Sequence, residues 1–513
     1  MHDRLLHRFL DQPGDRAATV DLDGAIWSFD EILGRALAVA QQLRAHHQVA
    51  GRVVLLRTGP GPLFSVADLA VLLAGGVPAV LPDLTAEQLT AVWRVVDPAA
   101  VIDTTGRDSP LLADAASRAG TLLHRVDEAT CRPTGTPLQW RAVARRWAGA
   151  RLEQAAAVVF TSGTTGTPRA VALGDAELVR GVRAWTAQWN YRPARALSYL
   201  PVSHVAQRIM GHTLMCLYGT TVVASTPERV VEDLAVHRPD TLLGVPHVWA
   251  RLAAAAHDGA AGRQLRQALA AVTTAVNGAA GLDRAVAADL EHLTGLRIAS
   301  AYGATETTVP AFHQVDAALP GLGRPVGISY RVTTQGELLL RGANLAAGFV
   351  DCWPHLRPVT DRDGWLRTGD LVRVDADGEL HLAGRLASAF KTSRGEMISP
   401  EPVEAHLLSH PAVTAACLLG HGLPRAIALV CAPGTAGWPR EQLAGLEGHL
   451  HRSAETARRR GELPWSDLAA VRVLPDSWRD LGLVTSTGKP RRTAIADRYR
   501  HLLTLPEPAR VPA

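Results

Sequence analysis

The sequence predicts an α/β protein with a large N-terminal domain and a small α+β C-terminal domain. Residues 1–150 alternate helical patterns with short apolar runs, which is typical of a mostly parallel sheet with helices on its faces. Residues 321–348 are strand-like with glycine and proline between the runs, and they predict a small barrel-like β part. Residues 389–513 have the length of one small α+β domain. We therefore expect an N-terminal domain over residues 1–384, a boundary at residues 385–388 and a C-terminal domain over residues 389–513.

The first elements follow from apolar spacing. Residues 29–46 have helical spacing, and residues 53–56 and 79–81 are short apolar runs that predict strands. The most apolar stretch, residues 64–81, contains Asp68 and a Gly-Gly-Val-Pro turn, so it predicts a helix, a turn and a strand rather than a membrane span. Asp175 is expected to be the N-cap of a helix that runs to Trp189.

Composition restricts the class of partner. The chain has 513 residues, 47% of them hydrophobic and 20% charged, with a formal net charge of +4, as in a soluble globular protein with more than one core. No basic stripe with interleaved aromatic residues occurs, so we expect no nucleic-acid partner. The five cysteines are scattered without a CxxC pair, which favours a reducing compartment and no structural zinc. Because residues 1–13 carry several charges and do not form a signal peptide, we expect a cytoplasmic protein without a membrane span.

Arginine supplies nearly all of the positive charge. Of the 53 basic residues only two are lysines, Lys391 and Lys489. A lysine kept against this bias is a candidate for a role that needs a compact, flexible ammonium rather than a planar guanidinium. Chance survival of two surface lysines is the alternative.

The strongest functional signal is the stretch of residues 155–169. An apolar run predicts a buried strand, and seven residues that are only Thr, Ser or Gly follow it. Glycines let successive N–H groups point into a concavity and hydroxyls add donors, which suits a polyphosphate, although an exposed turn can have the same composition. No Gly-Lys-Ser/Thr follows, so the stretch is not a Walker loop. The candidate phosphate-binding residues are Thr161, Ser162, Gly163, Thr164, Thr165, Gly166 and Arg169.

A second motif, residues 301–306, reads Ala-Tyr-Gly-Ala-Thr-Glu. An aromatic ring can stack on a purine, a glycine permits close approach, and a threonine can donate to a phosphate. The carboxylate of Glu306 is a hard oxygen ligand suited to Mg²⁺. The candidates here are Ala301, Tyr302, Gly303, Thr305 and Glu306. Further along, Asp370 follows a glycine turn, where a carboxylate can accept from two vicinal hydroxyls.

Residues 158–169 resemble, almost letter for letter, the phosphate loop of the adenylate-forming enzymes, the family of acyl- and aryl-CoA ligases, luciferases and peptide-synthetase adenylation domains. The resemblance covers about residues 15–500 and is nearest to the long-chain acyl-CoA synthetase branch, because residues 200–208 and 244–249 also match that branch. It implies that the protein binds ATP and Mg²⁺, and that the C-terminal domain swings between two orientations about a hinge at residues 385–388.

The resemblance also implies roles for individual residues. It assigns the backbone of Gly278, Ala279 and Ala280 to the adenine and the acid, Asp370 to the ribose, Arg385 to a second nucleotide contact, Thr161 and Glu306 to Mg²⁺, His204 to the border of the acid pocket, Lys489 to a mobile cation that bridges the acid and the α-phosphate, and Lys391 to a loop that faces the site in the second half-reaction.

Several residues depart from the family pattern, and three of them lie at the hinge or beyond it. Ala387 stands at the hinge where Asp or Lys is common, Arg394 stands where Gly is frequent, and Ser486 replaces the usual Pro before Thr-Gly-Lys. The change at residue 387 bears on the polar contacts of the hinge. The change at residue 394 bears on the route by which a pantetheine arm would enter.

The sequence therefore predicts an ATP-dependent ligase that adenylates a small-molecule acid and transfers the acyl group to CoA. Two alternatives stay open: transfer to an amine or to a free-standing carrier protein, since this chain has no carrier motif of its own, and activation of nitrite for N–N bond (diazo) formation. A nucleotide-binding sensor that kept the fold is the non-enzyme alternative. The presence of Glu306, Asp370 and both lysines speaks against that alternative.

Overall fold

The computed structural model describes residues 4–46, 48–150, 155–162, 168–189, 192–317, 319, 321–460, 463, 467–484 and 490–503, with the backbone alone for His46, Ala150 and Ser162. The chain packs as two compact units. One is formed by Met1–Tyr330 with Leu340–Leu366, and the other by Arg331–Leu339 with Arg367–Ala513. The predicted boundary at residues 385–388 lies inside the second unit, and it stays a prediction about which parts move.

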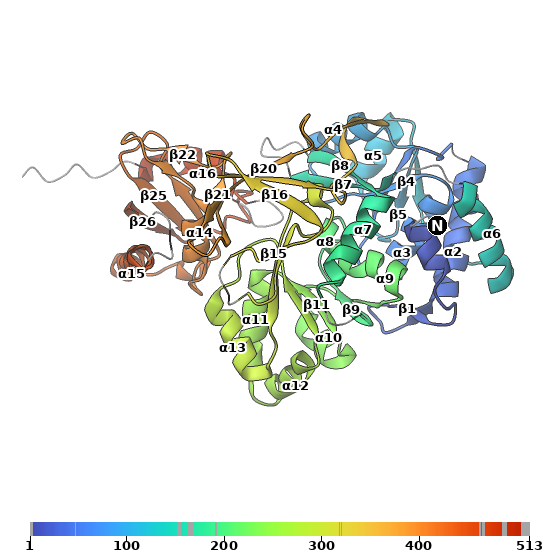
Figure 1. Ribbon diagram of the computed structural model, residues 1–513, viewed down its shortest axis with the longest axis horizontal. Helices are drawn as coiled ribbons and strands as arrows, with labels where there is room; N and C mark the ends of the chain where they lie inside the picture. The colour runs from blue at the N-terminus through green and yellow to red at the C-terminus, as the bar shows by residue number, and fades with distance from the viewer. Residues whose placement is uncertain are drawn as a thin grey trace, which may run out of the picture. The chain divides into compact units, whose positions relative to one another are not determined.

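Two large sheets form the frame of the first unit (Figure 1). The nine-stranded sheet has the order β15-β14-β13-β12-β11-β9-β10-β1-β2. Its strands are β1 Ala17–Val20, β2 Ile26–Ser28, β9 Arg195–Ser198, β10 Thr221–Ala224, β11 Thr241–Gly244, β12 Thr274–Asn277, β13 Ile298–Tyr302, β14 Phe312–Gln314 and β15 Arg324–Pro325. The eight-stranded sheet has the order β19-β18-β8-β7-β4-β3-β5-β6. Its strands are β3 Val53–Arg57, β4 Val77–Val80, β5 Ala100–Asp103, β6 Leu122–Arg125, β7 Ala155–Ser162, β8 Pro168–Gly174, β18 Gly348–Cys352 and β19 His355–Arg357.

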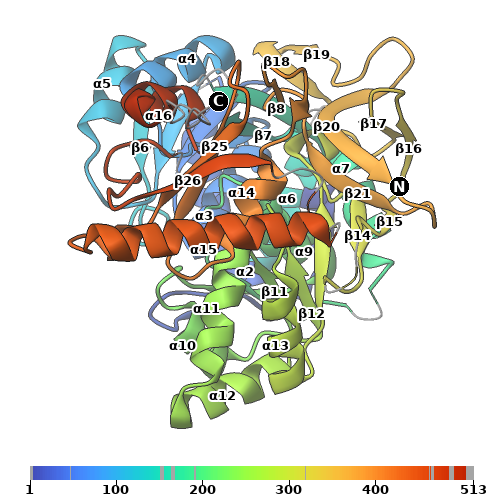
Figure 2. The ribbon, with the colours of Figure 1, turned by 90° about the vertical axis from the view of Figure 1, so that its left-hand side faces the viewer.

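Helices form three layers around these sheets. The middle layer shares one apolar core with both sheets and contains α1 Leu5–Leu10, α2 Phe29–His46, α3 Pro62–Leu73, α6 Pro137–Ala150, α7 Asp175–Thr186 and α9 Leu214–Tyr218. The free face of the eight-stranded sheet is covered by α4 Ala86–Val96 and α5 Pro110–Arg118. The free face of the nine-stranded sheet is covered by α10 Val230–His237, α11 Pro246–Ala256, α12 Gly259–Ala270 and α13 Arg284–Thr294 (Figure 2). The predicted α/β class, with helices on both faces of mostly parallel sheets, is confirmed.

Local predictions agree with this architecture except at one cap. The helix at residues 29–46 and the helix, turn and strand at residues 64–81 are present as α2, α3 and β4. Asp175 is not the N-cap, because Gly174 holds that position, and α7 ends at Thr186 rather than Trp189. The carboxylate of Asp175 instead accepts a hydrogen bond from the backbone N–H of Leu5, 3.0 Å away on α1.

The second unit is smaller and contains most of a four-stranded sheet ordered β16-β17-β20-β21, the barrel-like part that the sequence predicts. Those strands are β16 Ile328–Val332, β17 Glu337–Gly342, β20 Leu366–Val374 and β21 Leu380–Arg385. The C-terminal α+β part has the strands β22 Phe390–Lys391, β23 Met397–Ile398, β24 Ala415–Leu419, β25 Ala426–Cys431 and β26 Leu468–Leu474, with the helices α14 Glu401–Leu408, α15 Arg440–Arg459 and α16 Arg492–Arg498. Helices α14 and α15 pack on one face of the sheet β24-β25-β26, and α16 packs on the other.

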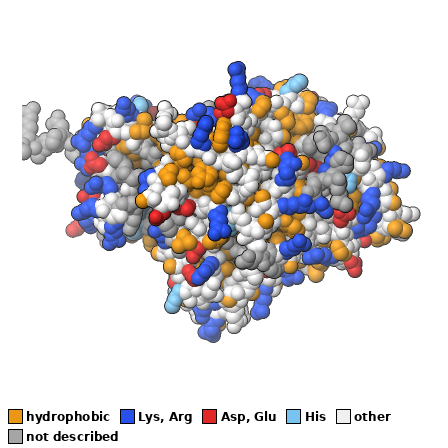
Figure 3. Space-filling model, viewed as in Figure 1, with side chains coloured by type: hydrophobic (Ala, Val, Ile, Leu, Met, Phe, Trp, Pro, Cys, Tyr) orange, Lys and Arg blue, Asp and Glu red, His pale blue; other side chains and the backbone are white. Residues whose placement is uncertain are grey.

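Charged side chains are spread over the face in Figure 3 rather than gathered on one element. Among the helices in the described ranges, none is both long enough and apolar enough to cross a bilayer.

Candidate functional site

The candidate site in the first unit lies at one edge of the nine-stranded sheet. Strands β9, β11, β12 and β13 are parallel neighbours, so their carboxyl ends meet at the same edge. Open α/β sheets bind ligands outside this edge. The segments that leave it carry three predicted groups: His204 after β9, Gly278–Ala280 after β12, and Gly303–Glu306 after β13. Pairing of the strands therefore brings together residues that are about a hundred positions apart in the sequence.

The turn after β12 is held in a strained conformation. Ala279 has φ +69°, in the left-handed region that residues with a Cβ rarely adopt. The backbone N–H of Gly278 donates to the carbonyl of Gly244 at 3.0 Å, and the side-chain amide of Asn277 donates to the carbonyl of Ala280 at 2.8 Å. Asn277 is fully buried, and its Oδ1 has no hydrogen-bond partner among the described residues. Asn277 was not among the predicted site residues, although its place directly before the glycine was a usable signal.

The motif after β13 forms a short 3₁₀ turn, Thr305–Thr307. The hydroxyl of Thr307 donates towards the carbonyls of Ala304 and Val309, at 2.8 and 2.7 Å. Thr308 is the second strained residue of the site, with φ +58°, and its buried hydroxyl donates to the carbonyl of Asn344 at 2.6 Å. These bonds fix the turn, in which Tyr302, Thr305 and Glu306 are half-buried. The next described element after the turn is the strand β14.

The second motif is connected to the strands of the phosphate loop. The backbone N–H of Ala346 donates to the carbonyl of Glu306 at 2.8 Å, and the next N–H, of Ala347, donates to the carbonyl of Ala172 on β8 at 2.9 Å. Two consecutive residues therefore join the nine-stranded edge to the β7–β8 pair. Within that pair, Thr161 lies opposite Arg169.

Part of the phosphate loop lies outside the described residues. Gly163, Thr164, Thr165 and Gly166 fall there, and Ser162 is described by its backbone as the last residue of β7. Thr161 donates from its hydroxyl to the carbonyl of Arg169 at 3.4 Å. The guanidinium of Arg169 is exposed and lies 5.0 Å from the ring centroid of Phe349. The strand predicted before the loop is confirmed, and the role of the loop stays a prediction.

His204 is exposed and occupies the N-cap position of the four-residue helix α8, Val205–Arg208. A neighbouring buried residue that the sequence analysis missed, Gln207, fixes the segment that leads to it. Its amide nitrogen donates to the Ser198 hydroxyl at 3.0 Å, and its carbonyl oxygen accepts from the N–H of Leu200 at 3.2 Å. Gln207 on α8 therefore ties the end of β9 and the start of the segment that follows it to the helix that begins after His204.

Residues 244–249, which carried part of the resemblance, have a packing role that the sequence analysis did not foresee. The fully buried ring of Trp249 covers Gly244, where a Cβ would lie 2.4 Å from the indole. Glycine at position 244 therefore lets the Trp249 ring pack against the end of β11. His247 follows Pro246 in the first turn of α11.

Other candidates belong to the second unit. Asp370 on β20 and Arg385 on β21 are register partners, and the Arg385 Nε lies 2.7 Å from the Asp370 Oδ1. Two residues that the resemblance assigns to one nucleotide thus bind each other. Lys391 is exposed on the short strand β22. Arg394 forms an ion pair with Asp467 at 3.6 Å, and Arg425 binds the same carboxylate at 2.6 Å. Lys489 and Ser486 lie outside the described residues.

Metal-ligand chemistry at Glu306 can be tested against the donors present. The described residues contain no group of three or more His, Cys, Asp and Glu side chains that could hold a metal ion. Mg²⁺ bound mainly through phosphates and water needs only one or two protein carboxylates. A single half-buried carboxylate at Glu306, with hydroxyl oxygens in the same unit, fits Mg²⁺ carried by a nucleotide and does not fit a resident metal centre.

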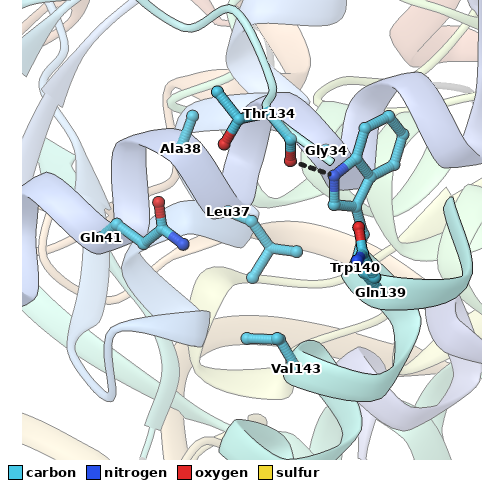
Figure 4. Close-up of a pocket in the computed structure, with 8 residues that line it drawn as sticks. All are labelled: Gly34, Leu37, Ala38, Gln41, Thr134, Gln139, Trp140 and Val143. Carbon is cyan, nitrogen blue, oxygen red and sulfur yellow. Dashed lines mark hydrogen bonds between the residues drawn. The ribbon is translucent and has the colours of Figure 1, made fainter. Parts of the chain in front are cut away.

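A separate cavity of about 90 Å³ lies between α2 and α6 and is lined by Gly34, Leu37, Ala38, Gln41, Thr134, Gln139, Trp140 and Val143 (Figure 4). Trp140 closes one side, and its indole N–H donates to the carbonyl of Thr134 at 2.7 Å. None of the described candidate residues lines this cavity, so it is not part of the site.

Comparison with known proteins identifies the class. The family model described as AMP-binding enzyme matches residues 6–350, and the chain belongs to this family of adenylate-forming ligases. Long-chain-fatty-acid–CoA ligase FadD15 of Mycobacterium tuberculosis is 27% identical over 88% of this chain and 87% of that protein. Isonitrile lipopeptide synthase of Streptomyces coeruleorubidus is 29% identical over 94% of this chain and 32% of that protein. The structure of o-succinylbenzoate coenzyme A synthetase (MenE) from Bacillus subtilis in complex with ATP and magnesium ion has a TM-score of 0.76 at 19% identity, over 96% of this chain and 98% of that chain. The predicted family, the adenylate-forming enzymes, and the predicted α/β fold class are both confirmed.

Proposed function

We propose that this ligase activates a fatty acid with ATP at the carboxyl edge of the nine-stranded sheet and transfers the acyl group to CoA. The observation that carries the proposal is the convergence of the segments after β9, β12 and β13, joined to β7–β8 by Ala346 and Ala347. Similarity to FadD15 along nearly the whole of both chains supports a fatty acid as the first substrate class to test.

In this proposal the described residues divide the nucleotide between them. The strained turn at Ala279 presents backbone to the adenine, and the half-buried ring of Tyr302 stacks on it. The hydroxyls of Thr161 and Thr305 and the guanidinium of Arg169 bind phosphate oxygens. Asp370 exchanges its bond to Arg385 for the ribose hydroxyls. Glu306 and Thr161 hold Mg²⁺, which neutralises phosphate charge when bound.

The reaction then needs positioning and charge neutralisation rather than covalent catalysis. A carboxylate oxygen of the acid attacks the α-phosphorus of ATP, an O–P bond forms, and the bond to pyrophosphate breaks. The Lys489 ammonium compensates the charge on the acid and the α-phosphate. In the second half-reaction, the CoA sulfur attacks the acyl carbonyl carbon, AMP leaves, and the thiol proton passes to solvent. Lys391 faces the site in that step.

The central experiment measures pyrophosphate release with the purified chain across saturated fatty acids of increasing length, aromatic acids and nitrite, each with and without CoA. Acyl-CoA formation is followed by mass spectrometry. We expect pyrophosphate release with one class of fatty acid and a CoA-dependent thioester. Pyrophosphate release with nitrite alone, or with no acid at all, would contradict the proposal.

A second acceptor is favoured by one finding. Isonitrile lipopeptide synthase aligns with nearly the whole of this chain over about a third of its own length, so similar sequences occur inside a larger synthase. If fatty acids release pyrophosphate but CoA does not increase turnover, the acceptor is a carrier protein or an amine. Adding a purified carrier with its pantetheine arm, and separately hydroxylamine, distinguishes these two acceptors.

The role of Lys489 is tested by replacing it. Lys489→Ala is expected to lose adenylation while nucleotide binding survives, because the ammonium acts on the reacting groups and not on the adenine or ribose. Lys391→Ala is the matched control, since it replaces the other of the two lysines and should slow thioester formation more than pyrophosphate exchange. Undiminished pyrophosphate exchange in Lys489→Ala would refute the assignment.

A further inference from the structure

A buried cluster of charges lies directly behind the segment that carries His204. Asp68 on α3, Arg208 at the end of α8, and His212 have side chains that are 0–2% exposed. Arg208 binds Asp68 through two contacts, Nη1 to Oδ1 at 2.7 Å and Nη2 to Oδ2 at 2.9 Å. The His212 Nε2 reaches the same carboxylate, 2.9 Å from Oδ2. One carboxylate on α3 thus binds two side chains of a neighbouring helical segment.

That helical segment is intrinsically weak. It consists of the four residues of α8, a π-helix at Ile209–Thr213, and the five residues of α9. Helices of this length are marginal in isolation, and π-helical turns are rare and occur frequently at functional sites. The backbone N–H of Arg208 donates to the carbonyl of His204 at 3.0 Å, so His204 and Arg208 belong to the same helical turn. Contacts outside the segment must therefore select where this turn begins.

The charges of the cluster are not an efficient source of stability. Burial raises the pKa of Asp68, but Arg208 and His212 outweigh this effect and bring it to about 2. Burial lowers the pKa of His212, but the Cys216 sulfur and Asp68 raise it to about 9. One carboxylate and two cations are therefore buried together at neutral pH. Buried ion pairs contribute little over apolar residues of similar volume, and their best-attested use is to fix register.

We propose that Asp68 is a positioning residue for acid activation: by binding Arg208 and His212 on either side of the start of the π-helix, it fixes the register of residues 204–213 and thereby places His204 beside the acid. The inference rests on the proposed function, which assigns His204 to the acid. It adds a residue on α3, more than a hundred positions before His204, to the determinants of acid binding.

The experiment compares three variants with the wild type. Asp68→Asn removes the charge that binds both partners. Asp68→Leu combined with Arg208→Met and His212→Gln removes all three charged groups of the cluster, so this variant is available if Asp68→Asn does not fold. Asp30→Asn is the matched control, because Asp30 forms a 2.7 Å ion pair with Arg141 between α2 and α6, away from the His204 segment. Each variant is assayed with dodecanoate, ATP and CoA, and amide hydrogen exchange is followed over residues 204–213.

For both Asp68 variants we expect the KM for dodecanoate to rise by about tenfold or more, because small displacements of a positioning group have effects of this size, while the KM for ATP changes by less than about twofold. Amide exchange should accelerate at residues 204–213, and Asp30→Asn should change neither quantity. An equal rise of both KM values, or unchanged exchange in a folded Asp68 variant, would overturn the inference. If the wild type activates no carboxylic acid, the proposed function fails, and the exchange measurement still decides whether Asp68 holds the register.

Discussion

Two Arg–Asp pairs in this protein have the same length and different surroundings. The closest contact between Arg208 and Asp68 is 2.7 Å, and so is that between Arg385 and Asp370. In the first pair both side chains are almost completely excluded from water, whereas in the second the Asp370 side chain is 6% exposed and the Arg385 side chain is 48% exposed. Breaking a buried pair leaves an uncompensated charge, while an exposed guanidinium is resolvated at once. Contacts of equal length therefore differ in what it costs to break them: the first pair is the costlier one, and the second is the pair that we propose is exchanged for the ribose.

The largest expected effect is on stability. Arg208→Met should lower the free energy of unfolding by about 3–5 kcal/mol, because it leaves the carboxylate of Asp68 buried without its main partner. Arg385→Met should lower it by less, since solvent partly screens a pair whose arginine is half exposed, although the Asp370 carboxylate is buried. Urea denaturation of both variants measures the difference, and similar losses would show that burial does not distinguish the pairs.

The pH dependence of stability tests the buried cluster of Asp68, Arg208 and His212 in a second way. The pKa of His212 is about 9 in the folded chain against 6.5 ordinarily, so its contribution is fully present below pH 6.5 and is lost as the pH rises through 9. The full contribution is on the order of 3 kcal/mol. Groups facing His212 are Asp68, whose pKa of about 2 keeps it ionised in this window, Arg208, Cys216 and the Phe64 ring. The stability advantage of the wild type over His212→Gln should shrink between pH 6 and pH 10, and an advantage that stays constant would contradict this.

Activity should be more sensitive than stability to changes at the Arg385–Asp370 pair. Asp370→Asn is expected to raise the KM for ATP by about 10- to 100-fold, the loss of one or two charge-assisted hydrogen bonds, with little change in the KM for the acid. The Asp68 variants should show the opposite pattern. Initial rates with ATP and acid varied separately give both constants, and a rise in the acid KM alone would reject the ribose assignment of Asp370.

The smallest effect is expected around the predicted hinge. Glu401 accepts hydrogen bonds from the Ser388 hydroxyl and, at 3.4 Å, from the N–H of Arg385, so this segment has polar contacts although residue 387 is alanine. Glu401→Gln should reduce stability by less than about 1 kcal/mol and change the ratio of thioester formation to pyrophosphate exchange. Rapid-quench measurement of both half-reactions tests this, and an unchanged ratio would separate Glu401 from domain motion.

Sequence reasoning succeeded where a residue acts through its local neighbours. The helix at residues 29–46 follows from apolar spacing, and the strand before the phosphate loop from a continuous apolar run. It failed for three buried polar side chains, whose partners depend on how the chain folds around them. Asp175 was expected to cap its own helix but binds Leu5, and Gln207 and Asn277 were not among the predicted site residues. A buried polar residue in an apolar run was the available signal, and Asp68 carried it.

By itself the sequence determined the α/β class, the adenylate-forming family and the stretches that contain the candidate residues. These follow from periodicity and from short motifs whose residue types the chemistry requires. The tertiary structure decided which of those stretches share a sheet edge, which arginine is buried, and that one aspartate on α3 binds both sides of a π-helical turn. Such facts depend on strand order and burial, because an Arg–Asp contact of the same length costs more to break where both side chains are excluded from water.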